Sequence, residues 1–486
     1  MEGGDALAAL PNILLITTDT QRCDTLAHLG NPHALSPRLD QLAREGVSFT
    51  NAHTASPVCL PARSSLLTGV HTPVHGAIEN GITRHDHLTV FPDLLKAAGY
   101  TNLMIGKTHF GPMPASFDVQ CVVGEKNSRH EDPYDDHLRR HGYTRPRSYP
   151  HDVPPSLFMD AFLVDTTIAA IRDVEAAERG PWFAFCSLVS PHEPLDPPGA
   201  WGDAYRDRPL PPLNYRAGEE AMHPAHLHAV LGLGRRDDKE QPFRDGQPDM
   251  ATIDTHRRRY YGLAAYCDAQ IGRLLDALDH MGRRENTLVI FSSDHGTELF
   301  DHGFYDKHNY YDESWRVPLI LRMPGTLPAG EQRDFAVWTD LPATILAAAG
   351  LTCPTMQGFD LFTPLTRGEA SPRRCTVGTL YRSCALATRR WKLEYYFEEG
   401  RGRLFDRLAD PCEQDDLYDA PAHRAVCDAL VAALLAWRSD VVDVQWLQEH
   451  TEGGGPIAQI VGAHTRGLRG TDAERRLQER VSDLDA

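Results

Sequence analysis

Short apolar runs that end abruptly in polar residues constrain the fold of this chain more than any other feature. The runs cover residues 12–17, 102–105, 182–189 and 288–291. Runs of this length are typical of parallel strands that are buried on both faces. The segments between them have helical periodicity, at residues 92–98, 159–177 and 259–280. This alternation predicts an α/β fold, with a large mixed, mostly parallel sheet sandwiched by helices. Because ligands of such sheets bind at the carboxyl ends of the strands, we expect the polar ends of the runs to meet at one edge.

The pattern changes after residue 350. Short strand-like runs separated by turns follow, at residues 376–380, 385–387, 391–397 and 404–405. They predict a smaller C-terminal antiparallel sheet, and the residues 423–437 that come next predict a helix. We therefore divide the chain into an α/β domain at residues 11–350 and a C-terminal subdomain at residues 351–440.

Two further segments, a surface insertion and a C-terminal tail, are predicted outside the cores of these two units. Residues 206–250 are rich in Pro, Gly, His and charge, which is typical of a surface insertion. His223, His226 and His228 in this insertion suggest a metal site, but a solvated loop is the favoured interpretation. The tail at residues 449–486 begins with glycines and turns charged. It is either a mobile end or an arm that docks on a neighbouring subunit.

Composition excludes several classes of function. Hydrophobic residues make up 41% and charged residues 24% of the 486, as in globular proteins. Lys and Arg number 49 against 67 Asp and Glu, a net charge of −18 that argues against broad binding to nucleic acid or anionic membranes. The longest apolar stretch, residues 429–437, is far shorter than the roughly 20 residues that span a bilayer. The first residues lack a signal-peptide pattern, and the ten cysteines form no CxxC pair, so we expect a cytoplasmic protein with reduced thiols.

Cys59 lies in the most informative motif. Pro61 follows two residues later and apolar residues follow a turn further on, so Cys59 is expected at the start of a helix, where the macrodipole favours an anion. The pattern CxPxR is completed by Arg63, and Thr68 with Gly69 makes it far more specific. This motif resembles that of the formylglycine-dependent sulfatases of the alkaline phosphatase superfamily. The resemblance implies that a formylglycine-generating enzyme converts Cys59, that its hydrated aldehyde is the nucleophile, and that Arg63 is its supporting cation.

Other motifs of the family follow in the same order. Asp19 with Arg22 resembles the first metal-binding loop of the family. Further family motifs are matched, in the same order, by residues 106–109, 190–194, 293–296, 307–319, 339–344 and 404–406 with 410–411. The resemblance therefore covers residues 11–440 and implies an alkaline phosphatase-like fold.

The resemblance also implies a role for each charged residue. Lys107, Arg63 and Lys307 would neutralise the oxygens of the sulfuryl group. His192 and Lys307 would protonate the leaving oxygen. His109 would take the proton from the second hydroxyl of the hydrate, which expels sulfate and restores the aldehyde.

The expected metal is one divalent cation, Ca²⁺, Mn²⁺ or Mg²⁺, with Asp19 and Asp294 as hard oxygen ligands. Two departures from the common sulfatase pattern bear on its identity. Thr20 stands where a second Asp is usual, and His295 stands where an Asn is usual. A hydroxyl and an imidazole shift the expected preference from Ca²⁺ toward Mn²⁺. We therefore expect Asp19, Thr20, the converted Cys59, Asp294 and His295 as ligands.

The pair Asp294–His295 is similar to a particular branch, which contains choline sulfatases, phosphonate monoester hydrolases and arylsulfatases. Asn80 fits a substrate-binding Asn of that branch, beside Lys107, His192 and Lys307. The branch implies a homodimer or homotetramer.

Three functions remain open from the sequence. The first is hydrolysis of a small-molecule sulfate monoester, and the alternative is hydrolysis of phosphonate monoesters or phosphodiesters by the same machinery. Lys107 with His109 favours the sulfatase, because the phosphonate hydrolases that the chain resembles carry neutral hydroxyl residues there. The third is a non-catalytic anion-binding protein with unconverted Cys59. The insertion, the tail or a neighbouring subunit would contact the organic part. Asn309, Tyr310 and Trp315 are candidates to line the pocket, although core packing is the favoured role for Trp315.

Overall fold

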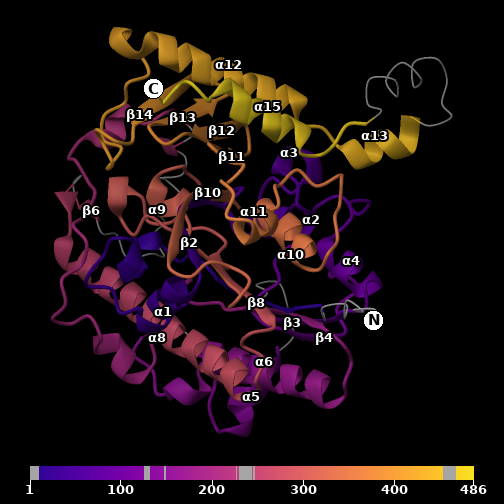
Figure 1. The fold of residues 1–486 in the computed structure, drawn as a ribbon. Coiled ribbons are helices and arrows are strands. Elements are labelled where there is room, and N and C mark those ends of the chain that lie inside the picture. Colours follow the sequence, from indigo (N-terminus) through magenta and orange to yellow (C-terminus); the bar gives the residue numbers. More distant parts are fainter. Residues whose placement is uncertain are drawn as a thin grey trace.

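A mixed sheet of eight strands forms the centre of the molecule (Figure 1). The computed structural model describes residues 10–124, 132–146, 149–225, 227–228, 243–244, 247–451 and 467–485. The strands lie in the order β10 (Glu331–Val337), β2 (Val47–His53), β9 (Leu319–Arg322), β8 (Thr287–Ser293), β1 (Asn12–Thr18), β5 (Trp182–Ser187), β3 (Thr101–Gly106) and β4 (Val119–Val122). Strand β9 runs antiparallel to both its neighbours, and the other described pairs are parallel. This confirms the large, mostly parallel sheet predicted from the apolar runs.

Both faces of the sheet are covered, which is why its central strands are apolar throughout. In β1, Ile13 and Leu15 face one core cluster, whereas Leu14 and Ile16 face the other. The first cluster includes side chains of α2 (Cys59–Thr68), α4 (Phe91–Ala97) and α10 (Asp340–Ala348). The second includes side chains of α1 (Pro37–Glu45), α6 (Met159–Ala176) and α8 (Met250–His280). The alternation of side chains along a strand thus anchors one helical layer on each face.

A separate sheet of four antiparallel strands forms the C-terminal part, as predicted. Its strands are β11 (Thr376–Leu380), β12 (Ser383–Ala387), β13 (Trp391–Tyr396) and β14 (Arg401–Asp406). Helices α12 (Arg424–Asp440) and α15 (Asp472–Arg480) pack on it and share one buried apolar cluster with it (Figure 1).

The described part of the tail packs on the subdomain of its own chain. Glu474 of α15 is fully buried, and its carboxylate accepts hydrogen bonds from Arg373 and Trp437. Residues 467–485 are therefore anchored to the fold of their own chain, which argues against the alternative of a mobile end. Helix α13 (Val444–Thr451) is joined to the large domain at its start, where Gln445 accepts from the Thr89 N–H and donates to the His87 carbonyl.

The described part of the insertion at residues 206–250 is anchored more firmly than a solvated loop. Glu219 and His223 are buried, and Glu219 forms an ion pair with His302 at 3.0 Å. His223 therefore does not belong to a solvated surface, contrary to our interpretation, and His226 lies outside the described residues.

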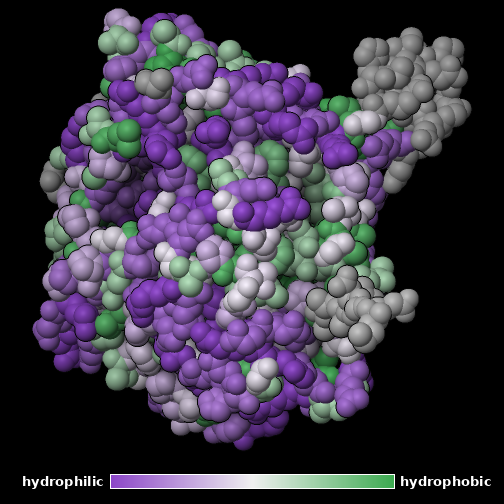
Figure 2. All heavy atoms as spheres, viewed as in Figure 1, coloured by the Kyte–Doolittle hydropathy of each residue, from purple (hydrophilic) through white to green (hydrophobic). Residues whose placement is uncertain are grey.

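The remaining elements are short. They are α3 (Thr72–His75), α5 (Pro133–Arg140), β6 (Phe243–Arg244), β7 (Gln247–Pro248), α9 (Asp312–Trp315) and α11 (Phe362–Thr366). The face shown in Figure 2 is covered mostly by hydrophilic residues, with apolar residues scattered among them. In the part of the chain that the structure describes, no helix has the length and apolar character needed to cross a membrane.

Candidate active site

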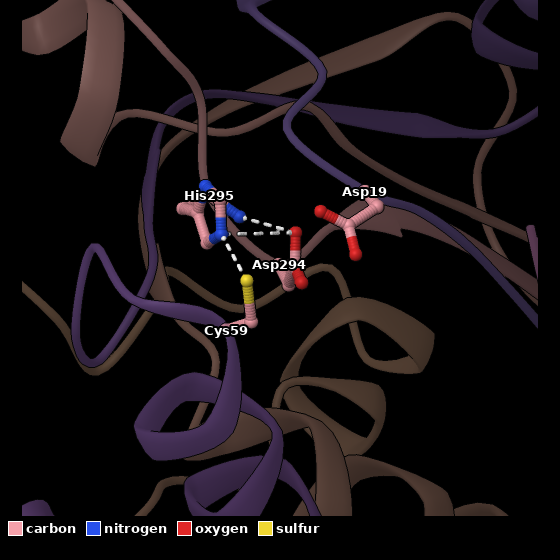
Figure 3. A group of neighbouring side chains, drawn as sticks. All are labelled: Asp19, Cys59, Asp294 and His295. Atoms are coloured by element: carbon pink, nitrogen blue, oxygen red, sulfur yellow. Dashed lines mark hydrogen bonds and ion pairs between the residues drawn. The ribbon is translucent and has the colours of Figure 1, made fainter. Parts of the chain in front are cut away.

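The polar ends of β1, β3, β5 and β8 meet at one edge of the sheet, as the strand pattern predicts. Asp19 follows β1, Lys107 follows β3 and Asp294 follows β8. The start of α2 comes up to this edge and presents Cys59, whose side chain points toward His295 (Figure 3). The sheet thus gathers residues that lie far apart in the sequence into a single buried group.

Cys59 is the first residue of α2 and is 2% exposed. Its Sγ lies 3.1 Å from His295 Nε2 and 3.3 Å from Lys307 Nζ. His109 forms a further hydrogen bond to it. The next backbone N–H, that of Leu60, donates to Asn80 Oδ1 at 3.1 Å and so fixes the first turn of α2.

The electrostatic surroundings of Cys59 favour an anion. Burial alone would raise the pKa of the thiol, but Lys107, Lys307 and His295 together hold it well below its ordinary value. The helix start adds to this effect, because unpaired backbone N–H groups carry partial positive charge. The site is therefore built to hold negative charge at this position.

Asp19, Cys59, Asp294 and His295 form a group that could hold a metal ion. Their ligand atoms lie within 4.8 Å of one another, and all four residues are buried (Figure 3). Among the described residues, Asp19 Oδ1 is buried and has no hydrogen-bond partner. His295 Nδ1 lies 2.8 Å from the carbonyl oxygen of Gly296, to which it donates, so Nε2, which faces Cys59, is the nitrogen that could ligate a metal. This donor set fits a divalent cation with oxygen and nitrogen ligands.

Arg63 lies behind this group. Its side chain is fully buried, with Nε donating to Asp294 Oδ2 at 2.8 Å and an Nη donating to Asp19 Oδ2 at 3.3 Å. Another Nη donates to the Lys107 carbonyl and to Ser187 Oγ. Arg63 does not line the cavity, so it holds the carboxylates in place, whereas the family resemblance led us to expect it at the sulfuryl oxygens.

The remaining expected residues line one cavity of about 650 Å³. They are Thr20, Asn80, Lys107, His109, His192 and Lys307, together with Cys59. Lys107 Nζ forms an ion pair with Asp19 Oδ2. His192 Nδ1 donates to the Glu193 carbonyl at 2.8 Å, which leaves Nε2 for a ligand. The Thr20 hydroxyl donates to the Asp19 carbonyl at 2.6 Å.

Some residues at the site did not emerge from the sequence analysis. Asp306 lines the cavity and lies 3.7 Å from Lys307 Nζ. Glu79 and His308 approach to 3.4 Å across the rim, between the loops that carry Asn80 and Lys307. Asp306 and His308 flank Lys307 in the motif, and that adjacency was the available signal.

The aromatic candidates near Lys307 are placed elsewhere. Tyr310 and Trp315 belong to a buried apolar cluster with Val58 and Ala385, and Asn309 is not among the cavity-lining residues. Tyr310 and Trp315 thus pack in the core beside Val58, the residue before α2, and core packing is the role that we favoured for Trp315.

Comparison with known proteins shows which family the chain belongs to. Residues 11–351 match the model of the family described as Sulfatase, and residues 300–440 match the model described as N-sulphoglucosamine sulphohydrolase, C-terminal.

An arylsulfatase from Clostridium perfringens is 28% identical over 473 residues, which cover 87% of this chain and 94% of the relative. A choline-sulfatase from Rhizobium meliloti is 25% identical, with 85% and 83% covered. The solved structure of a phosphonate monoester hydrolase from Silicibacter pomeroyi is 25% identical with a TM-score of 0.79, and 89% of this chain and 96% of that chain are covered. With its alkaline phosphatase-like fold, the chain belongs to the sulfatase family of sulfuric ester hydrolases.

Proposed function

We propose that the chain hydrolyses a small-molecule sulfate monoester by way of a formylglycine derived from Cys59. In the net reaction water enters, the bond between sulfur and the ester oxygen breaks, and an alcohol and inorganic sulfate leave. The observation that carries the proposal is the buried Cys59 at a helix start, surrounded by Lys107, Lys307 and His295 and adjoining the Asp19–Asp294 pair. A structural cysteine would have no need of this cationic and metal-binding environment.

The proposed cofactors are the formylglycine and one divalent cation. When present, they supply a nucleophilic hydroxyl and a Lewis acid that polarises a sulfuryl oxygen. Asp19, Asp294 and His295 would hold the cation, and Arg63 would fix both carboxylates. The imidazole of His295 favours Mn²⁺ over Ca²⁺. Thr20 is retained as a candidate ligand through its hydroxyl oxygen.

The side chains around Cys59 would bind the sulfate group and move protons. Lys107 and Lys307, both nearly buried, would neutralise the charge that develops on the sulfuryl oxygens. The proton for the leaving alcohol would come from His192 Nε2 or from Lys307. His109, which contacts Cys59, would accept the proton that accompanies release of sulfate. The amide of Asn80, with its oxygen bound to the Leu60 N–H, would present its Nδ2 donors to the substrate.

The alternative is hydrolysis of phosphonate monoesters or phosphodiesters. It is favoured by the similarity to the phosphonate monoester hydrolase from Silicibacter pomeroyi. A sulfate monoester and a phosphonate monoester are both singly charged tetrahedral anions, so charge alone does not separate them. The cationic pair of Lys107 and His109 is the feature that favours sulfate.

The decisive experiment compares two substrates on one protein. The chain would be co-expressed with a formylglycine-generating enzyme, its proposed maturation partner, and assayed with Mn²⁺ and then with Ca²⁺. We expect a higher kcat/KM for 4-nitrophenyl sulfate than for a 4-nitrophenyl phosphonate monoester, and no turnover by Cys59→Ala. A higher kcat/KM for the phosphonate would favour the alternative. Turnover of neither ester by protein with converted Cys59 and bound metal would contradict both.

A further inference from the structure

As long as Cys59 is a cysteine, it adds a sulfur atom to the buried group of Asp19, Asp294 and His295. The group then offers one thiol, one imidazole and two carboxylates, which converge from the ends of β1 and β8 and from the start of α2 (Figure 3). All four residues are at most 2% exposed. The converted chain would present oxygen in place of this sulfur. The two forms of the chain therefore differ in the class of metal that their donors select.

The spacing of the four donors is close to that of a four-coordinate metal site. Zinc sites with bonds of about 2.0–2.3 Å place neighbouring ligand atoms about 3.3–3.8 Å apart. In this group the ligand atoms lie within 4.8 Å of one another. Cys59 Sγ lies 3.1 Å from His295 Nε2, and Nε2 lies 3.7 Å from Asp294 Oδ1. Small side-chain shifts would therefore bring all four donors to one ion.

The surroundings of two donors leave them available to an ion. Among the described residues, no hydrogen bond reaches the buried Oδ1 of Asp19. The hydrogen bond from His295 Nδ1 to the Gly296 carbonyl orients the imidazole ring, so that Nε2 faces Cys59. A buried carboxylate oxygen without a partner is costly, and a cation that binds it removes this cost.

Neighbouring cations restrict which metal can enter the group. Lys307 Nζ lies 3.3 Å from Cys59 Sγ, and Lys107 Nζ pairs with Asp19. Their charge repels a second cation, so the ion that binds is the one for which the donors have the highest affinity. For thiolate and imidazole donors, the affinity for Zn²⁺ is far above that for Mn²⁺, and Ca²⁺ prefers oxygen ligands alone.

We propose that Cys59, His295, Asp19 and Asp294 form a zinc site in the unconverted chain, and that conversion of Cys59 abolishes this site in favour of a harder metal. Sγ is its soft donor, Nε2 is its nitrogen donor, and each carboxylate supplies one oxygen. The first half of the inference depends only on the thiol, and the second half rests on the proposed function. The metal bound by a preparation would then report the chemical state of Cys59.

The first test titrates metals into the unconverted full-length chain. The protein is expressed without a formylglycine-generating enzyme, freed of metal, and checked by mass spectrometry for an intact Cys59. In competition with a chromophoric chelator, we expect one tightly bound Zn²⁺ per chain, with an affinity at least about 100-fold above that for Mn²⁺. Comparable affinities for the two metals would overturn the zinc site.

A matched pair of cysteine variants locates the sulfur ligand. Cys59→Ser should lower the affinity for Zn²⁺ at least about tenfold and leave the affinity for Mn²⁺ nearly unchanged, because a hydroxyl is a hard donor. Cys412→Ser, at an exposed cysteine, should bind both metals as the wild type does. Zn²⁺ binding that is equally tight in Cys59→Ser and wild-type protein would overturn the assignment of Cys59 as a ligand.

Co²⁺ gives a spectroscopic readout that a merely structural role of Cys59 would not change. Co²⁺ enters zinc sites, and a bond between Co²⁺ and a thiolate produces a charge-transfer band in the near ultraviolet that oxygen and nitrogen ligands do not produce. Unconverted wild-type protein with Co²⁺ should show this band, and added Zn²⁺ should remove it. Weak binding of Co²⁺ to surface histidines gives no such band. Its absence from wild-type protein with bound Co²⁺ would overturn the proposal.

Converted protein completes the test and separates the two proposals. After co-expression with the formylglycine-generating enzyme, we expect the affinity for Zn²⁺ to fall at least about tenfold and the Co²⁺ band to be absent. Equally tight Zn²⁺ binding by both forms would overturn the change of metal on conversion. A zinc site in the unconverted chain, with no ester turned over by the converted chain, would contradict the sulfatase function alone. Turnover of 4-nitrophenyl sulfate, with no thiolate band in unconverted protein, would overturn the zinc site alone.

Discussion

At the residue scale, the group of residues that could hold a metal depends on a side chain that does not belong to it. Arg63 donates from one guanidinium to carboxylates of Asp19 and Asp294, which follow two different strands. A planar fork can hold two carboxylates in a fixed relation, which the single ammonium of a lysine cannot do. Arg63 is thus a positioning residue for the proposed metal site.

Substitution of Arg63 by lysine should therefore weaken metal binding. We expect Arg63→Lys to retain the fold and to lower the affinity for Mn²⁺ about 10–100-fold, as loss of a supporting hydrogen-bond partner does at metal sites. The affinity is measured by titration of metal-free protein with Mn²⁺ in a calorimeter. Arg140→Lys, at an exposed arginine, serves as the control. An unchanged affinity in Arg63→Lys protein would show that the carboxylates need no such support.

Much of the candidate site could be predicted from the sequence, because its residues lie in contiguous motifs. The position of Cys59 at a helix start follows from Pro61 and the apolar turn after it. The placement of Arg63 behind the carboxylates could not be predicted, since it depends on where the ends of β1 and β8 lie relative to α2.

At the element scale, α15 is held by one buried carboxylate. Burial would raise the pKa of Glu474, but Arg373 and then His71 lower it to about 2. His71 Nε2 lies 3.0 Å from Glu474 Oε1, and Arg373 also pairs with Asp340 of α10. The last described helix is therefore tied to the start of α3 and to a helix of the large domain.

Replacement of Glu474 by glutamine should destabilise the protein in a pH-dependent way. A carboxylate whose pKa falls from 4.5 to about 2 on folding contributes about 3 kcal/mol at neutral pH. This stability is present above pH 4.5 and is lost as the pH falls toward 2. The free energy of unfolding in urea should thus differ between wild type and Glu474→Gln at pH 7, and the difference should shrink below pH 4.5. The exposed Glu479→Gln on the same helix should show neither effect.

The elements themselves were largely predictable, because apolar runs and helical periodicity are local. The two exceptions have different causes. Helix α8 begins at Met250, ahead of the predicted residue 259, because its first turns are polar and carry little periodicity. Asp249 caps it by accepting from the Thr252 N–H at 3.4 Å. The antiparallel direction of β9 has no local signal, since it is set by its pairing with β2 and β8.

At the scale of the whole molecule, the proposed metal should stabilise the folded chain. A cation that binds only the folded state adds about 2.7 kcal/mol when its free concentration is 100 times Kd. We therefore expect EDTA to lower the Tm by several degrees and Mn²⁺ to restore it, as followed by calorimetry. In Asp294→Asn protein the Tm should no longer respond to Mn²⁺. A wild-type Tm that is indifferent to EDTA and to added Mn²⁺ would contradict the metal site.

We also propose that the chain assembles into a homodimer or homotetramer, as its resemblance to the choline sulfatase and phosphonate hydrolase branch implies. Light scattering on the eluting protein should then give two or four times the chain mass of 54.1 kDa. A mass of one chain across the micromolar range would contradict this expectation.

The anchoring of α15 also sets an order of events during synthesis. This helix is made after every other described element, at about 5–20 residues per second on the ribosome, tens of seconds after Cys59. Until it arrives, His71, which lies shortly after α2 in the sequence, and Arg373 lack their buried carboxylate. In the finished fold Cys59 is 2% exposed. The proposed conversion of Cys59 would therefore have tens of seconds in which this last anchor of the fold is still missing.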